Sequence, residues 1–238
     1  MNIGMYILLF LSVIISGLVV LFVNISSKNL KLILSFSGAF LFAISVLHLI
    51  PEIYQSGTMH VGIYILIGFF AQILMEFFSE GIEHGHVHVH KHNHKGHAFP
   101  YAMMLGLSVH SFLEGMPLAN FNGASHQSLL TGIVMHNIPI AIALMTMLLQ
   151  SHISKTTAIF WLVIFALVTP LGTFTSYAIG ENLIGNFATY SDKIMAVVVG
   201  IFLHISTTIL FESSDNHRFN FIKFMVIILG AGFAMLTI

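Results

Sequence analysis

Apolar residues fill the chain in blocks of roughly twenty, and short stretches with the polar, proline and charged residues separate the blocks. A helix needs about twenty such residues to cross a bilayer core of about 30 Å. The blocks lie at about 4–23, 31–50, 61–80, 98–119, 128–150, 156–179, 193–213 and 219–238. The pattern predicts an all-α polytopic transmembrane helix bundle with eight spans, as a single transmembrane domain over residues 1–238.

Composition supports a membrane protein and excludes several other classes. The chain is 57% hydrophobic and 7% charged, whereas soluble domains carry about 25% charged residues. A net charge of −1 without a basic stripe does not favour nucleic acid as a partner. The absence of cysteine excludes disulfides and thiolate metal sites. Residues 1–23 have no basic leader and no small-residue cleavage site, so we expect a retained first span.

Lysine and arginine orient the predicted bundle. With eight spans, all but one of these residues fall on the same side: Lys28, Lys31, Lys91, Lys95, Lys155, Arg218 and Lys223. Only Lys193 falls on the other side. Because cytoplasmic loops carry the excess of positive charge, both termini are predicted outside. The loop at 81–97 is then cytoplasmic.

Three ionisable residues fall inside the fourth and fifth predicted spans. His110 and Glu114 are four residues apart and share a helix face, and His136 lies near the middle of the next span. At about 1.5 Å per residue, both histidines lie about 12–14 Å below the outer surface. Ionisable groups at that depth usually mark a functional site. Two imidazoles and a carboxylate suit zinc and similar divalent cations, although a buried polar pair that joins helices is the structural alternative.

Neighbouring residues extend this candidate metal site. Ser111 and Asn137 lie beside the histidines and are secondary candidates for oxygen ligands, or else bond between helices. Pro117 and Pro139 each follow a candidate ligand within three residues. A proline frees a backbone carbonyl and bends the helix, which membranes tolerate where the backbone lines a cavity or packs on protein.

Four motifs and a His-rich loop carry a family resemblance. "HSFLEGMPLA" (110–119) and "HNIP" (136–139) are similar to the fourth- and fifth-span signatures of the ZIP (Zrt/Irt-like) divalent-metal transporters. "GAFLFAISVLHLIPE" (38–52) and "TPLGTFTSYAIG" (169–180) resemble the second and sixth spans. The resemblance implies eight spans, metal uptake toward the cytoplasm, His110, Glu114 and His136 as ligands, and a homodimer.

Departures from the family pattern bear on how many metals bind. Many members place a bridging glutamate four residues after the fifth-span histidine, where this chain has Ile140, and another before the sixth-span proline, where it has Thr169. Both missing carboxylates favour a mononuclear site. The seventh span lacks the family's acidic residue followed by proline, so His204 matches no family ligand.

Other ionisable residues lie outside the candidate site. Residues 84–97 hold seven histidines, in a loop that either captures metal transiently or has no dedicated role. His48 and Glu52 at the end of the second span are predicted to gather cations or to form a solvated pair. Glu76 and Glu80 are predicted at the cytoplasmic interface, and an exit role for His204 and Glu212 is a further hypothesis.

The leading functional hypothesis is a transporter of a divalent metal, zinc first, with iron, cadmium, manganese and cobalt not distinguished. We expect metal ions and the lipid bilayer as partners, no organic cofactor, no catalytic residue, and a plasma (inner) membrane location. Alternatives are a metal-binding sensor or scaffold without flux, an exporter, and an intramembrane metalloenzyme. The enzyme is disfavoured because the chain has no HExxH motif.

Overall fold

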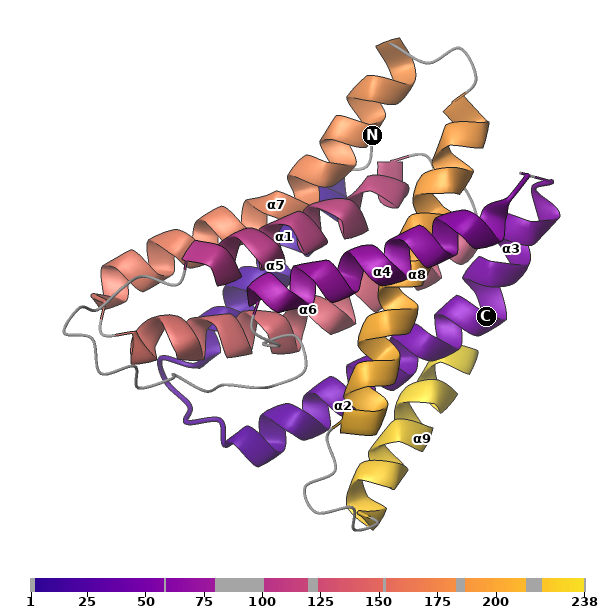
Figure 1. Ribbon diagram of the computed structural model, residues 1–238. Helices are drawn as coiled ribbons and strands as arrows, with labels where there is room; N and C mark the ends of the chain where they lie inside the picture. Colours follow the sequence, from indigo (N-terminus) through magenta and orange to yellow (C-terminus); the bar gives the residue numbers. More distant parts are fainter. Residues whose placement is uncertain are drawn as a thin grey trace.

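The computed structural model describes residues 3–57, 59–79, 101–119, 124–151, 153–182, 187–212 and 220–237. Over these ranges the chain is a bundle of helices and contains no strand (Figure 1). In chain order the elements are α1 (Ile3–Val19), α2 (Ser27–Ile44), the π-helix η1 (Ser45–Leu49), α3 (Ile50–Gln55), α4 (Val61–Ser79), α5 (Tyr101–Gly115), the 3-10 helix η3 (Met116–Ala119), α6 (Ala124–Gln150), α7 (Lys155–Asn182), α8 (Phe187–Glu212) and α9 (Phe221–Met235). The all-α class is confirmed.

Five helical stretches are long and apolar enough to cross a membrane by length and composition. They are Ser27–Gln55, Val61–Phe78, Gln127–Gln150, Lys155–Gly180 and Tyr190–Phe211. Helices α1 and α9 are apolar but shorter. A membrane-spanning helical bundle is therefore the architecture, and the count of eight spans and the outward termini stay predictions.

The second predicted span continues further than its hydropathy indicates. Residues 51–55 were predicted to form a break, but they are helical and place Glu52 inside α3. The π-turn of η1 explains the difference, because the Ile50 amide donates to the Ser45 carbonyl, five residues back. This wider turn comes directly before Pro51, which has no amide hydrogen to donate. The helix therefore passes the proline instead of ending there.

Burial differs strongly among the long helices. In α6, 72% of the most apolar window is buried inside the protein, against 22% in α4. Helix α4 carries large exposed apolar side chains, among them Leu66 and Phe70. Such side chains are expected on a helix that faces lipid. Helix α6, which carries His136, is therefore central to the bundle.

Helices α5 and α7 touch backbone to backbone beside the candidate site. A Cβ atom added to Gly115 would lie 2.2 Å from the Thr169 carbonyl oxygen, and one on Gly172 would lie 2.1 Å from the Phe112 oxygen. Only glycine permits such an approach, a common device in membrane helix packing. The contact fixes α5, and with it the face that carries His110 and Glu114.

Candidate metal site

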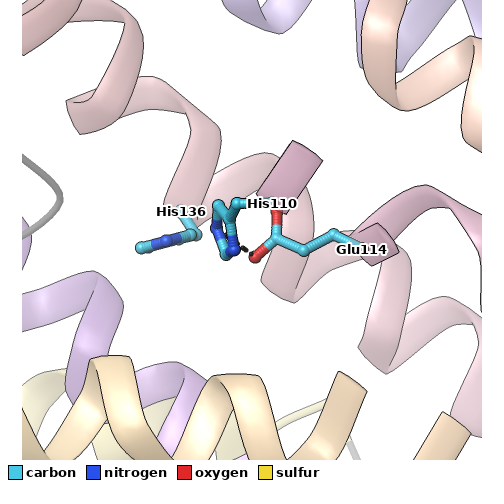
Figure 2. Close-up of side chains that lie close together, drawn as sticks. All are labelled: His110, Glu114 and His136. Carbon is cyan, nitrogen blue, oxygen red and sulfur yellow. Dashed lines mark ion pairs between the residues drawn. The ribbon is translucent and has the colours of Figure 1, made fainter. Parts of the chain in front are cut away.

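Helix α5 supplies two of the candidate ligands. His110 and Glu114 are fully buried, and their side chains meet on one face of the helix, with His110 Nε2 3.0 Å from Glu114 Oε1. Figure 2 shows this ion pair as the dashed line. The spacing of four residues brings the two groups together, as expected from the sequence. A carboxylate is thus held in the protein interior with an imidazole at its side.

Helix α6 brings the third group to the same point. The rings of His110 and His136 lie 5.9 Å apart, centroid to centroid, and nearly perpendicular at 88° (Figure 2). One donor atom from each of His110, Glu114 and His136 lies within 4.8 Å of the other two. Donors around a tetrahedral zinc, each at about 2 Å from the ion, are about 3.3 Å apart. A small movement of these three side chains toward one another would therefore place three ligand atoms around one zinc ion.

Buried polar atoms of Glu114 and of the residues that follow the two histidines in sequence have no hydrogen-bond partner within the described part of the chain. They are the Ser111 hydroxyl, both polar atoms of the Asn137 amide, and Glu114 Oε2. Ser111 and Asn137 are fully buried, like the three ionisable residues. A buried polar group without a partner costs about 1–3 kcal/mol. The donor set, rich in nitrogen and oxygen, is of the kind that a divalent cation satisfies.

Apolar and neutral residues occupy the two positions where carboxylates were noted as missing. Ile140, one turn after His136, is buried in the hydrophobic core, and Thr169 is buried in α7. Over the described ranges, His110, Glu114 and His136 are the one group of three potential His, Cys, Asp or Glu ligands that lies this close together. The structure thus places no second carboxylate at either of these positions.

Prolines interrupt the helix hydrogen bonds around the site. Pro117 lies in η3 directly after α5, and Pro139 lies inside α6, three residues after His136. Since a proline donates no amide hydrogen, Pro139 leaves the Met135 carbonyl without its helical partner. Thr173 of α7 satisfies another carbonyl here, because its Oγ1 donates to the Gly115 oxygen at 2.8 Å. The sequence pattern does not single out Thr173, since a threonine in an apolar span carries no distinctive signal.

The comparison with protein families decides the class of this protein. Residues 79–238 match the family model of the ZIP zinc transporter. The chain belongs to the ZIP family. A comparison with curated proteins finds no match.

ZIP membership fixes the broad function. Members of the ZIP family are transporters of divalent metals and not enzymes, and the protein is an integral membrane protein. The matched region holds α5 to α9 and all five candidate ligands. The resemblance drawn from the fourth- and fifth-span motifs is therefore confirmed, whereas the metal and the ligand roles stay predictions.

A second histidine–glutamate pair of this ZIP protein was not predicted. His204 Nε2 of α8 lies 3.5 Å from Glu76 Oε2 of α4, and the His204 ring packs edge-on against Phe69 at 5.0 Å. The sequence predicts Glu76 at the cytoplasmic interface and an exit role for His204 together with Glu212, whose side chain lies outside the described residues. The sequence signal was present, since both are isolated ionisable residues in apolar helices.

His48 and Glu52 lie on the continuous stretch of α2, η1 and α3 and are not members of the three-residue group. His48 Nε2, Glu52 Oε2 and the Ser45 hydroxyl are buried atoms with no hydrogen-bond partner among the described residues. A role for His48 and Glu52 at an entrance stays a prediction. Glu80 and the His-rich loop at 81–97 lie outside the described residues.

Proposed function

We propose that this ZIP-family protein moves a divalent cation, zinc in the first place, across the membrane toward the cytoplasm through His110, Glu114 and His136. The observation that carries the proposal is the meeting of these three fully buried groups from two helices, within 4.8 Å of one another. Paired imidazoles with one carboxylate suit zinc and other borderline divalent metals. Iron, cadmium, manganese and cobalt are the other candidate substrates.

The ligand set favours passage over permanent storage. Three protein ligands leave at least one position of a tetrahedral zinc open, and Ser111 and Asn137 are secondary candidates to fill it. With two neutral imidazoles, the occupied site carries a net charge of about +1. A transported ion must be held weakly enough to leave, and the prolines next to the site supply backbone carbonyls along a route for release. We propose one metal per site, because Ile140 and Thr169 offer no carboxylate.

The distribution of lysine and arginine supports the direction. It predicts the loop at 81–97 on the cytoplasmic side, where its seven histidines would receive the released metal. We infer a plasma (inner) membrane location with both termini outside, and a homodimer as the assembly. These inferences rest on the charge distribution and on the family.

Zinc flux into proteoliposomes tests transport against binding alone. The purified protein is reconstituted, a zinc-sensitive dye is enclosed, and zinc is added outside. We expect a saturable flux that empty vesicles do not show. Saturable zinc binding by the same preparation, without flux of zinc or of the other candidate metals, would contradict the transporter and favour a sensor or scaffold.

A further inference from the structure

Three polar side chains on η1 and α3 turn their ends into the protein. The Ser45 hydroxyl, His48 Nε2 and Glu52 Oε2 are buried atoms without a hydrogen-bond partner among the described residues. His48 and Glu52 are nevertheless only half-buried as whole residues, so other parts of these two side chains are exposed. Amphipathic side chains near a membrane boundary usually turn their polar ends toward water. These two do the reverse, which a solvated pair does not explain.

The π-turn of η1 determines where these side chains lie on the helix. Leu41 is buried before this turn, and Leu49 and Ile53 are buried after it. In a uniform α-helix, with 3.6 residues per turn, the face of Leu41 would continue through positions 48 and 52. The wider turn instead moves His48 and Glu52 from the centre of the packed face to its edge. Turns of this kind occur frequently at functional sites.

Helix α6 runs in the opposite direction to α2 in the structure. Helix α9 packs parallel to α2 (Figure 1), with Phe233 against Phe40 at 5.8 Å between ring centroids and the preceding turns in contact through Gly230. The start of α6 meets the end of α9, because Ser128 Oγ donates to the Thr237 carbonyl oxygen at 3.0 Å. The start of α6 therefore lies at the same end of the bundle as the end of α2.

This antiparallel packing places His48 at a different depth from the candidate metal site. Gly132 of α6 lies against Ile44, since an added Cβ would meet the Ile44 side chain. His136 is four residues past Gly132, and His48 is four residues past Ile44 in the opposite direction. At about 1.5 Å per residue, the two histidines differ in depth by about 12 Å. In the predicted topology, His48 is the one closer to the outer surface.

His48 and Glu52 have the chemistry to share one metal ion. They are four residues apart, and this spacing puts two ligands on one helix face within reach of a zinc ion. An imidazole nitrogen and a carboxylate oxygen suit zinc and similar divalent cations. Two protein ligands leave at least two positions of a tetrahedral ion to water. Such a site would therefore bind more weakly than one with three protein ligands.

We propose that His48 and Glu52 form an outer site, which binds a divalent cation before it passes inward to His110, Glu114 and His136. The Ser45 hydroxyl, three residues deeper than His48, offers an oxygen on the way inward. The direction of transfer rests on the proposed function, whereas the binding of metal at the outer site does not.

Zinc binding by the purified full chain tests the outer site. The seven loop histidines are replaced by glutamine, and equilibrium dialysis measures the zinc bound per chain. We expect two zinc ions in this background and one in His136→Ala, which keeps the outer site. Adding His48→Gln or Glu52→Gln to His136→Ala should weaken the remaining binding by roughly tenfold or more. No loss with either change would overturn the outer site.

Two further variants check the specificity of this loss. His48→Gln alone should keep one zinc ion at the affinity of the inner site, which also shows that the variant folds. His60→Asn is the matched control, because His60 is exposed in the turn between α3 and α4 and asparagine tolerates its positive φ of 62°. In the His136→Ala background this change should leave zinc binding unaltered. A loss equal to that of His48→Gln would overturn the proposal.

Proteoliposome flux separates the outer site from the proposed function. We expect His48→Gln to raise the external zinc concentration at half-maximal flux by about tenfold and to keep the maximal flux within about twofold. A lower maximal flux at an unchanged half-maximal concentration would overturn the delivery of metal from the outer site. Zinc binding at both sites without any flux in the wild type would overturn the transporter and support the outer site as a binding site.

Discussion

His110 with Glu114 and His204 with Glu76 combine the same two chemical groups in different surroundings. The first pair is fully buried and has a second histidine, His136, close to it. The second pair is 10% and 26% exposed, its atoms are 3.5 Å apart, and Phe69 packs on the histidine ring. Over the described residues, the second pair belongs to no group of three potential ligands.

This contrast indicates that residue type alone does not identify a metal site in a membrane helix. A third potential ligand from another helix and complete exclusion of solvent distinguish the first pair. The second pair joins α4 to α8, which also touch through Gly68 and Gly200. We therefore propose metal binding for the first pair and helix association for the second, and the following experiments separate the two roles.

Removal of a ligand should have the largest effect. We expect His136→Ala to weaken zinc binding by roughly 100-fold or more, since even indirect partners of a metal site contribute 10–100-fold. His204→Ala should change the affinity by less than about threefold. Competition with a fluorescent chelator measures both, in a background where the seven loop histidines are replaced by glutamine. Equal losses in both variants would remove the distinction between the pairs.

Acidification should have the second largest effect, a fall in zinc uptake. Metal binds the neutral imidazole, so protons compete with it, and histidine has a reference pKa of about 6.5. We expect zinc uptake to fall below about pH 6, by about tenfold per pH unit for each imidazole that binds metal. Proteoliposome flux between pH 5 and 8 measures this. Uptake unchanged down to pH 5 would count against ligation by histidine.

A change that disturbs the packing of α5 on α7 should weaken zinc binding more than one that disturbs the packing of α4 on α8. Gly115→Ala places a Cβ within 2.2 Å of the Thr169 carbonyl, and overpacking typically costs about 1–3 kcal/mol. We expect lower thermal stability and about tenfold weaker zinc binding. Gly200→Ala, with a similar clash against the Ile65 oxygen at 2.0 Å, should lower stability but keep the affinity.

Gly232→Ala is the control for both glycine variants, because its added Cβ meets nothing within 4 Å. It should leave stability and zinc affinity unchanged. If Gly200→Ala weakens zinc binding as much as Gly115→Ala does, the two helix pairs are not independent and this part of the account is wrong.

Loss of the Thr173 hydroxyl should have the smallest effect. Thr173→Val removes its bond to the Gly115 carbonyl, which is worth about 1 kcal/mol, so zinc affinity should fall by about two- to fivefold. Thr175→Val is the matched control, because the Thr175 hydroxyl is exposed and bonds only to Leu171 of its own helix. Chelator competition compares the two. An equal change in both would assign the effect to the helix and not to the site.

Much of this arrangement was predictable because it depends on position along a helix. The apolar blocks gave the helices, the spacing of four residues put His110 and Glu114 on one face, and depth along antiparallel neighbours put His136 beside them. Each inference uses only the rise and the turn of a helix. The ZIP signature then connected the group to metal transport.

The remaining features depend on which helices contact each other. The pattern of apolar and polar residues along the chain does not determine those contacts. Glu76 and His204 lie in α4 and α8, which are far apart in sequence, so their pairing follows from packing. The π-turn before Pro51 joined two stretches that hydropathy separates. Thr173 depends on the backbone contact of α5 with α7, which needs Gly115 and Gly172 to face each other.

The most direct test of the central claim compares zinc flux through Glu114→Gln and Glu76→Gln in proteoliposomes. Both changes remove a carboxylate beside a histidine and keep its shape. We predict that flux in Glu114→Gln falls by roughly 100-fold or more, whereas Glu76→Gln retains flux within about threefold of wild type. Flux that survives in Glu114→Gln, with the protein folded and inserted, would contradict the passage of metal through this site.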